Sequence, residues 1–563
     1  MKRLTYIFLM LSLVVFYSCD SLLDKKPLDK FTNSNYWTSE ANVEVYANTF
    51  FNEFAGYGVS FDNTTLNDNQ AGRGFTNWNY TSVPASHGTW NNSYTEIRRA
   101  NFMIEQVPNI SSMSESAKAN WIGIARLYRA WHHYKIVRKF GDCLFVDKPL
   151  TDSKDDKDNY LFAARQDRDT VMNKVLDDLE YAVNNITADA SSRVAFNNAL
   201  ANAIKAEICL FEGTFCKYRS SSDGQKAADK ERASKYLTAA KTACQEIMGN
   251  SMYELSDTYQ ENYNSLDLKD NKEVILYKKY VYGTMSHSTI AYTSSSTMQE
   301  GMTKDAFDSY LFLDGKPAST TTYDNTDKFV KNSKGELSIV HMLSVRDKRL
   351  SQTVDSVILH RGNAFNRFEQ TMATTSSTGY GVLKFDNPII PVDNRVNDGR
   401  NETDAPLFWL AETYLAYAEA CAELGTCTNN DLDISVNKLR ERAGLPKLTI
   451  NPDADPANNH GVSNLIWEIR RERRVELMFD KNDRYWSLVR WHQLDKLDSK
   501  KYPNVLKGAW VGDADKAQAT ITADGYVDAS NGASREYHAK YYLDPIPSGQ
   551  IDLNENLGQN YGW

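Results

Sequence analysis

Four side chains within eight residues of one another suit a polyhydroxylated ligand. Trp78 and Tyr80 offer flat ring faces on which the apolar C–H faces of a sugar can stack, while Arg73 and Asn77 can hydrogen bond to its hydroxyl groups. Residues 55–89 are rich in Gly, Asn, Asp, Ser and Thr, which is typical of a loop, and binding residues concentrate on loops. We therefore predict that Trp78 is exposed and stacks against a sugar ring. The alternative is that Trp78 plugs this loop onto a helical core.

Further candidates for ligand contact lie in the same loop and in the central region. Three polar residues that precede Arg73 could also reach a ligand: Asp68, Asn69 and Gln70. Weaker candidates, for a second side of the site, are tyrosines on central loops: Tyr282, Tyr292, Tyr323 and Tyr380. The chain holds 32 Tyr and 11 Trp, and both residue types suit wet interfaces and ligand platforms because each has an apolar face and a polar tip.

No catalytic or cofactor-binding motif accompanies these residues. The chain lacks a Walker loop and the patterns GxGxxG, H-E-x-x-H and G-x-S-x-G. A glycoside hydrolase would need two carboxylates across a cleft, and among 73 acidic residues nothing singles out such a pair. His132 and His133 are adjacent, so on a helix they diverge by roughly 100° instead of converging on one metal. We predict a binding protein without catalytic activity or cofactor, and no residue pattern predicts metal ligands.

The cysteines give no sign of a disulfide or a zinc site. Cys209 and Cys216 are seven residues apart on a predicted helix, a rise of roughly 10 Å, which is too far for a disulfide. No C-x-x-C or Cys/His cluster is present. We predict that most of the six cysteines after residue 19 are small core residues: Cys143, Cys209, Cys216, Cys244, Cys421 and Cys427.

The N-terminus predicts export to a membrane. Lys2 and Arg3 precede an apolar stretch over residues 7–16 that is too short to span a bilayer, and the Ser18-Cys19 pair that follows resembles a bacterial lipoprotein cleavage site. We predict a signal peptide over 1–18, a lipid on Cys19 and a polar tether over 19–35. The net charge is −9, with no basic run after residue 3, which argues against nucleic acid as the main partner.

Helices on both sides of the candidate loop must hold it in place. Apolar residues recur at helical spacing over these segments: residues 39–50, 90–101, 121–140, 169–186, 197–215, 233–248, 406–424 and 431–443. Small residues such as Ala203 and Gly213 mark close helix contacts, and paired helices of this kind resemble tetratricopeptide repeats. Residues 250–403 interrupt the repeats with a mixed, loop-rich insertion, in which residues 273–281 predict a strand.

The segment over residues 464–491 is the most informative in the chain. Its apolar residues fall on one helical stripe, four arginines occur within five residues (470–474), and Asn482-Asp483 interrupts the pattern as a turn would. Glu468–Arg471 and Arg473–Glu476 are spaced to pair along the helix surface. We predict a helical hairpin whose arginines clamp carboxylates or carbonyls of neighbouring segments. The alternative is an ordinary charged amphipathic helix.

This segment resembles the C-terminal signature of the SusD/RagB family, surface nutrient-binding lipoproteins of Bacteroidetes. The family pattern is roughly I-x-x-E-R-R-x-E-L-x-F-E-G-x-R-[YW]-x-D-L-x-R-W, and the matching residues are Ile469, Glu472, Arg473, Arg474, Glu476, Leu477, Phe479, Arg484, Tyr485, Leu488, Arg490 and Trp491. The usual Glu-Gly is Asp480-Lys481 with one extra residue, and Ser487 stands where the pattern has Asp. Weaker landmarks extend the resemblance in order from Cys19 to Asn560.

The resemblance implies a mostly α-helical SusD-like fold, with irregular tetratricopeptide-type repeats over about 90–250 and 404–445 and an inserted ligand-binding region over about 250–403, all within one unit over 36–563. It also implies a lipid-anchored protein of the outer membrane, facing the exterior, that captures an oligosaccharide and delivers it to a SusC-like TonB-dependent transporter. Two other functions stay open: binding of a peptide or glycoprotein, and a tetratricopeptide-type adaptor for protein partners.

Overall fold

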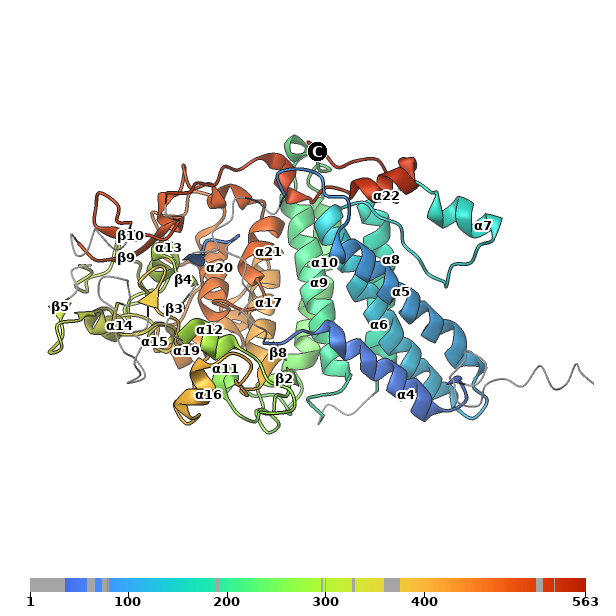
Figure 1. Cartoon of the computed structure of the whole chain (residues 1–563), viewed down its shortest axis with the longest axis horizontal. Coiled ribbons are helices and arrows are strands. Elements are labelled where there is room, and N and C mark those ends of the chain that lie inside the picture. Colours follow the sequence, from blue (N-terminus) through green and yellow to red (C-terminus); the bar gives the residue numbers. More distant parts are fainter. Residues whose placement is uncertain are drawn as a thin grey trace, which may run out of the picture.

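The computed structural model describes residues 36–57, 66–72, 78, 80–187, 192–294, 297–298, 300–326, 330–358, 375–512, 520–530 and 532–563. Long helices form one half of the molecule, and short helices, strands and loops form the other, with the helices of the C-terminal third between them (Figure 1). The predicted signal peptide and tether, residues 1–35, lie outside the described residues.

The N-terminal half is a stack of long helices. Neighbours along the chain pack against each other, α5 with α6, α6 with α8 and α9 with α10. Side chains cap the helices where they begin: the Ser114 hydroxyl accepts from the Ala117 N–H before α6, and the Asp229 carboxylate accepts from the Arg232 N–H before α10. The main helices here are α4 (Glu40–Asn48), α5 (Gly88–Gln106), α6 (Glu115–Phe140), α8 (Arg168–Asn185), α9 (Asn198–Tyr218) and α10 (Lys230–Met248).

Close packing at the small residues of α9 is confirmed at Gly213. A Cβ at this glycine would lie 2.7 Å from Leu237 Cγ and 3.0 Å from the Leu237 backbone nitrogen. Only a residue without a side chain therefore lets α10 approach α9 this closely. Short helical segments join the long helices: η1 (Thr49–Glu53), η2 (Val107–Asn109), α7 (Lys154–Asp156), η3 (Lys157–Leu161) and η4 (Ser221–Asp223).

The helices of the C-terminal third complete the helical part of the fold. Helix α17 packs against both α10 and α20, so it joins the two halves. Gly444, with φ of 76°, ends α19 as expected for a left-handed C-cap. These helices are α17 (Leu410–Glu423), α18 (Asn429–Asp433), α19 (Val436–Ala443), α20 (Asn464–Glu476) and α21 (Asp483–Arg490).

The loop-rich half contains short, scattered strand pairs. Strand β2 lies within the strand predicted over 273–281 and pairs antiparallel with β8. Strand β1, next to Asp68 and Asn69, pairs with β4 and so ties the N-terminal loop to residues 300–302. The strands are β1 (Gln70–Gly72), β2 (Val274–Lys278), β3 (Thr297–Met298), β4 (Glu300–Met302), β5 (Val330–Lys331), β6 (Leu337–Ser338), β7 (Thr375–Ser376), β8 (Ala405–Trp409), β9 (Lys507–Trp510) and β10 (Tyr526–Asp528).

Short helices fill the rest of the loop-rich half. The C-terminal segment, residues 536–563, then runs across the long helices. Ser548 N donates to Pro84 O at 2.9 Å and Arg165 Nε donates to Leu557 O at 2.6 Å. In Figure 1 the segment runs along the upper edge, from the loop-rich half to α7. The short helices before residue 536 are α11 (Glu261–Asn264), α12 (Thr289–Ser294), α13 (Lys304–Asp308), α14 (Val340–Val345), α15 (Lys348–Thr353), α16 (Val392–Val396), η6 (Leu494–Leu497) and η7 (Pro503–Val505). Those of the C-terminal segment are η8 (Ala539–Tyr542), α22 (Ser548–Leu553) and η9 (Glu555–Leu557).

The arginines of α20 clamp neighbouring segments, as predicted. Arg470 pairs with Glu423 of α17 at 3.0 Å, and Arg474 pairs with Asp305 of α13 at 2.8 Å. The predicted Glu468–Arg471 pair forms at 3.2 Å. The predicted pair between positions 473 and 476 is wrong, because each of those side chains is drawn to a residue of another segment. Arg473 pairs with Asp483, while Glu476 pairs with Arg349 and Arg442.

Arg349 is the centre of a buried charge network. This side chain is about 1 % exposed and contacts Asp347 at 2.6 Å and Glu472 and Glu476 at 2.9 Å each. Arg440 pairs with Glu472 at 2.6 Å, so the network joins α15, α19 and α20. Buried charges of this kind persist because each has a partner with which it can form hydrogen bonds.

The cysteine prediction is confirmed. All six cysteines after residue 35 are free thiols, and all but Cys427 are buried, where they act as small core residues. Within the part of the chain that the structure describes, no helix combines the length and the apolar character that a membrane span requires.

Candidate functional site

The exposure predicted for Trp78 is wrong. Its side chain is 5 % exposed, and its ring stacks on Tyr541 with the ring centroids 4.3 Å apart. The indole N–H donates to the backbone carbonyl of Glu536. The C-terminal segment therefore covers Trp78, and the alternative reading, that this indole plugs the loop onto the rest of the fold, is the one the structure supports.

Asp68 and Tyr380 are also buried, which corrects their expected availability to a ligand. Arg484 binds the Asp68 carboxylate with two hydrogen bonds of 2.6 and 2.7 Å. Arg474 and Arg484 hold the pKa of Asp68 well below its usual range, although burial acts in the opposite direction. Tyr380 is 1 % exposed and stacks on Phe307 at 4.6 Å. Asn69 and Gln70 are buried as well.

The remaining candidates are more accessible or lie outside the described residues. Tyr323 is 39 % exposed, and one face of its ring packs on Phe312 at 6.2 Å. Tyr292 and Tyr80 are half-buried, and Tyr282 is exposed. Arg73 and Asn77 fall outside the described residues.

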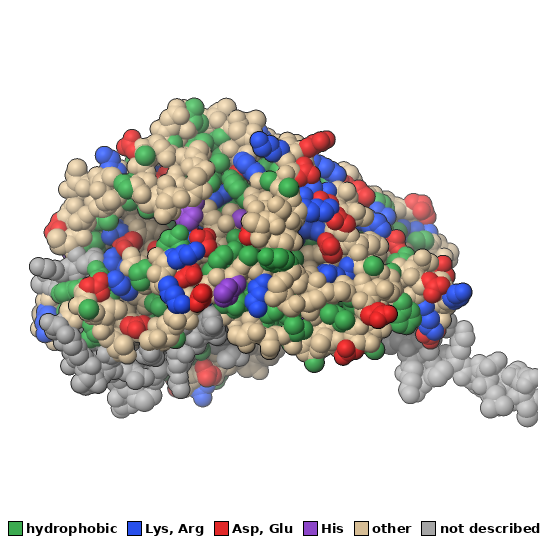
Figure 2. Space-filling model, turned by 90° about the horizontal axis from the view of Figure 1, so that it is seen from above, with side chains coloured by type: hydrophobic (Ala, Val, Ile, Leu, Met, Phe, Trp, Pro, Cys, Tyr) green, Lys and Arg blue, Asp and Glu red, His purple; other side chains and the backbone are tan. Residues whose placement is uncertain are grey.

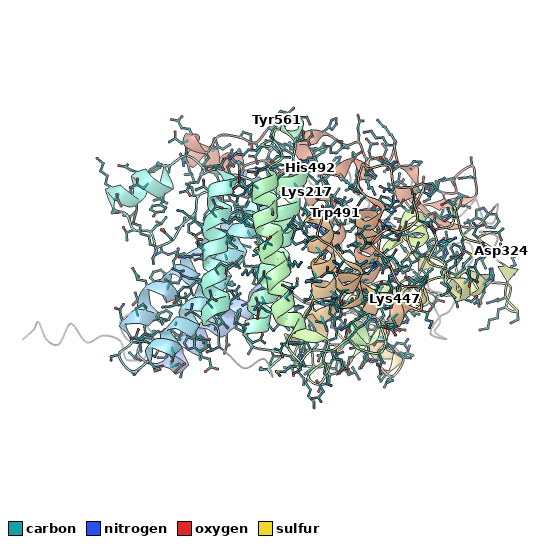
Figure 3. All side chains as sticks on the ribbon, turned by 180° about the vertical axis from the view of Figure 1, so that it is seen from behind. Lys217, Asp324, Lys447, Trp491, His492 and Tyr561 are labelled. Atoms are coloured by element: carbon teal, nitrogen blue, oxygen red, sulfur yellow. The ribbon has the colours of Figure 1, made fainter. Side chains whose placement is uncertain are left out.

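The structure does not gather the predicted residues at one place. Asp324, which follows Tyr323, lies at the outer end of the loop-rich half, whereas Tyr561 lies on the upper edge that the C-terminal segment forms (Figure 3). Trp78 packs against that segment, and Tyr292 lies on α12, apart from both in Figure 1. Seen from above, the upper face mixes hydrophobic, acidic and basic side chains, with histidines near its middle (Figure 2).

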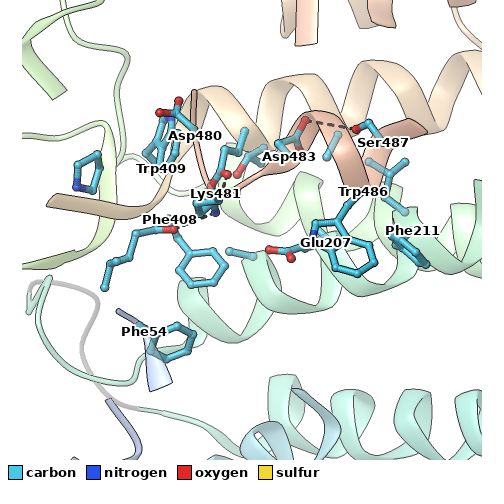
Figure 4. Close-up of a pocket in the computed structure, with 18 of the residues that line it drawn as sticks. Phe54, Glu207, Phe211, Phe408, Trp409, Asp480, Lys481, Asp483, Trp486 and Ser487 are labelled. Carbon is cyan, nitrogen blue, oxygen red and sulfur yellow. Dashed lines mark hydrogen bonds and ion pairs between the residues drawn. The ribbon is translucent and has the colours of Figure 1, made fainter. Parts of the chain in front are cut away.

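A cavity that the sequence did not predict lies where the long N-terminal helices meet the helices of the C-terminal third. It has a volume of about 520 Å³, within the roughly 300–1,000 Å³ typical of ligand pockets. Its walls come from α6, α9, α17, α21, β8 and the chain around residues 53–57. Aromatic rings dominate them, among others Phe54, Trp131, Phe211, Phe408 and Trp486 (Figure 4).

Charged groups interrupt this aromatic lining. Lys481 pairs with Glu412 at 2.6 Å and also lies over the Phe408 ring, with Nζ 4.5 Å from the centroid. Burial raises the pKa of Glu412 to about 7, although Lys481 counteracts this shift. Arg138 lies over the Trp486 ring at 4.2 Å. The cavity therefore offers ring faces together with fixed donors and acceptors, which suits a small polar ligand with an apolar part.

An unusual turn forms the cavity wall between α20 and α21. Phe479, Lys481 and Asn482 have φ of 69°, 46° and 53°, in the left-handed region that residues other than glycine rarely adopt. Such conformations cost roughly 1–3 kcal/mol each and cluster at functional sites. The family pattern has Glu-Gly here, whereas this chain has Asp480-Lys481 and one extra residue, a departure that indicates an altered turn.

One cluster of potential metal ligands is better explained by ion pairs. Ligand atoms of Asp169, Glu212 and Cys216 lie within 4.8 Å of one another. Arg168 pairs with Glu212 at 2.5 Å and Arg219 pairs with Asp169 at 2.7 Å, so two guanidinium groups already neutralise these carboxylates. A cation placed there would meet like charges.

Two family models match the chain, and together they cover most of it. The model described as the SusD family matches residues 272–563, and one described as "Starch-binding associating with outer membrane" matches residues 19–210. The chain is 24 % identical over 502 residues to a SusD-like protein of Bacteroides ovatus, covering 85 % of this chain and 80 % of that protein.

Solved structures share the fold. A SusD-like carbohydrate-binding protein from Bacteroides fragilis aligns with a TM-score of 0.69 at 20 % identity, covering 93 % of this chain and 99 % of that one. A structure described as holding a xylogluco-oligosaccharide aligns with a TM-score of 0.56 at 18 % identity, covering 93 % of this chain and 97 % of the other. The model of the SusD family alone matches more than half of the sequence, and the helical stack and the arginine clamp agree with this match. The chain therefore belongs to the SusD family.

Proposed function

We propose that this protein captures an oligosaccharide at the cell surface and delivers it to a SusC-like TonB-dependent transporter, without catalysing a reaction. The observation that carries the proposal is membership of the SusD family, in which one relative is described as carbohydrate-binding and another is described with a xylogluco-oligosaccharide. The proposed lipid anchor is Cys19, the residue at which the outer-membrane family match begins.

The proposed glycan-binding residues are the predicted candidates other than those that are found buried. Tyr323 offers ring surface to a ligand because 39 % of this residue is exposed, and its ring lies nearly parallel to that of Phe312 with the centroids 6.2 Å apart. We keep as proposed contacts the half-buried Tyr80 and Tyr292, together with Arg73 and Asn77, which lie outside the described residues. Trp78, Asp68 and Tyr380 are buried and are no longer proposed as contacts.

Tyr323→Ala is expected to weaken glycan binding by about threefold to tenfold, because one stacked ring contributes about 0.5–1.5 kcal/mol. The soluble protein, lacking residues 1–18 and with Cys19 removed, would first identify a glycan on an array that includes xylogluco-oligosaccharides. Calorimetric titration would then compare the glycan affinity of this variant with that of Tyr561→Ala. Tyr561 is also exposed, at 56 %, but lies on the upper edge of the molecule. Equal affinity of both variants would remove Tyr323 from the site, and an array without any bound glycan would contradict the proposed function.

A transporter is expected to co-purify with the anchored protein. Mild detergent extraction of outer membranes, followed by affinity purification, should recover a β-barrel protein in a near-stoichiometric amount. The same purification from cells that carry Cys19→Ala should recover far less, because the buried acyl chains hold the protein at the membrane at about 0.8 kcal/mol per CH₂. Recovery of this chain alone from wild-type membranes would favour the adaptor function instead.

A further inference from the structure

Among the described residues that line the cavity, one acidic and one basic side chain form no ion pair. Among the described residues that line it, most charged side chains form ion pairs: Glu412 with Lys481, Asp483 with Arg473, Asp480 with Lys384, and Arg490 with Glu419. Glu53 pairs with Lys135. The described residues supply no ion-pair partner for Glu207 of α9 or for Arg138 of α6. A ligand that satisfies this cavity would therefore bring one positive and one negative group.

Both groups lie beside the Trp486 ring: the Arg138 guanidinium carbon is 4.2 Å from the ring centroid, and Glu207 lies next to the same ring in Figure 4. The pKa of the Tyr134 hydroxyl is raised mainly by burial; Arg138 lowers it and Glu207 raises it further, so both charges act on this one hydroxyl. They nevertheless form no ion pair with each other. A molecule that carries an ammonium and a carboxylate group on one carbon could form an ion pair with each of the two side chains at the same time.

The surroundings of Glu207 favour a ligand with an apolar part. Its carboxylate projects into the cavity between the rings of Phe408 and Trp486 (Figure 4). The wall also holds an unmet donor, because Nη1 of Arg473 is buried and has no hydrogen-bond acceptor among the described residues. A ligand carboxylate would supply acceptors to the guanidinium groups, and the rings would cover an apolar side chain.

We propose that this cavity binds a small zwitterion, a free α-amino acid with an apolar side chain, whose ammonium group pairs with Glu207 and whose carboxylate pairs with Arg138. Lys481, in the turn over Phe479–Asn482, forms its ion pair with Glu412 and not with Glu207. This site is distinct from the proposed glycan surface and does not depend on it.

The test uses the soluble chain and the twenty free amino acids as probes. Thermal shift assays should show stabilisation by at least one apolar amino acid, and calorimetric titration should then give its affinity. Glu207→Gln and Arg138→Gln should each weaken that affinity about tenfold or more, because each removes one charge-assisted hydrogen bond. Glu246→Gln, an exposed carboxylate on α10, is the matched control and should leave the affinity unchanged.

Analogues of the bound amino acid separate the two contacts. Its amide lacks the carboxylate and should be insensitive to Arg138→Gln, whereas its N-acetyl form lacks the ammonium group and should be insensitive to Glu207→Gln. The proposal is overturned if none of the twenty amino acids stabilises the protein, or if both variants bind as wild type does. Stabilisation by cellobiose that Glu207→Gln abolishes, without any amino acid effect, would also overturn it and would assign the cavity to a neutral sugar. None of these outcomes alters the glycan-array result.

Discussion

Arg349→Met is expected to lower the free energy of unfolding by about 3–5 kcal/mol, because it leaves buried carboxylates without a cation. Asp347, Glu472 and Glu476 all contact this guanidinium group, and their side chains are no more than 2 % exposed. Arg440 and Arg442 would still contact the two glutamates, but Asp347 would lose its ion-pair partner. Urea denaturation of the soluble protein would measure the loss.

The control is an ion pair of similar length at the surface. Lys500 contacts Glu536 at 2.6 Å, with both side chains more than half exposed, and Lys500→Ala should leave the stability close to that of wild type. Arg349→Lys keeps the charge but loses the fork that reaches three carboxylates, so an intermediate loss is expected. Wild-type stability of Arg349→Met would show that the network is not a determinant of folding.

Trp78→Ala is expected to cost about 3–5 kcal/mol of folding stability while leaving glycan affinity unchanged. The substitution removes the ring that stacks on Tyr541 and the donor to the Glu536 carbonyl. Trp78→Phe keeps an aromatic ring but not the donor, so it should cost less. A thermal melt and a titration with the array-identified glycan would be run in parallel.

Tyr282→Ala provides the comparison for Trp78, since this tyrosine is 47 % exposed and its removal should barely alter the melting temperature. The opposite pattern for Trp78→Ala, a lost affinity with an unchanged melt, would return the indole to the ligand site and would mean that the C-terminal segment opens in solution.

The helices and the clamp were predictable because their signals are local. The apolar period of residues 121–140 and 197–215 is set by neighbours within one helix, and the observed helices α6 and α9 include these ranges apart from one residue at the start of α9. Four arginines on a partly apolar helix must find partners when buried, so the sequence predicts clamping without naming each carboxylate. The partner named for Arg473 was wrong because Asp483, beyond the turn, lies closer than the same-helix glutamate.

The burial of Trp78 was not predictable from its surroundings. Its loop offers little apolar sequence, and its covering residues stand 458 and more positions away along the chain. The cavity was missed for the same reason: Phe54, Glu207, Phe408 and Trp486 come from four separate elements, and no spacing relates them. The extra residue at Asp480-Lys481 departs from the family pattern, but it indicated only an altered turn and not a cavity.

The C-terminal segment covers Trp78 and hydrogen bonds to Pro84 and Arg165. These contacts therefore determine which parts of the fold can form during translation and which form only after it. A ribosome completes the N-terminal helices long before it reaches residues 536–563, and domains generally begin to fold while synthesis continues. The loop at Trp78 and the end of α6, where Lys139 pairs with Asp544 at 2.8 Å, must wait for the last residues to be made. A nascent chain thus leaves an indole and several backbone groups uncovered until translation ends. A nonsense mutation that removes residues 536–563 would therefore also remove these contacts to the N-terminal helices.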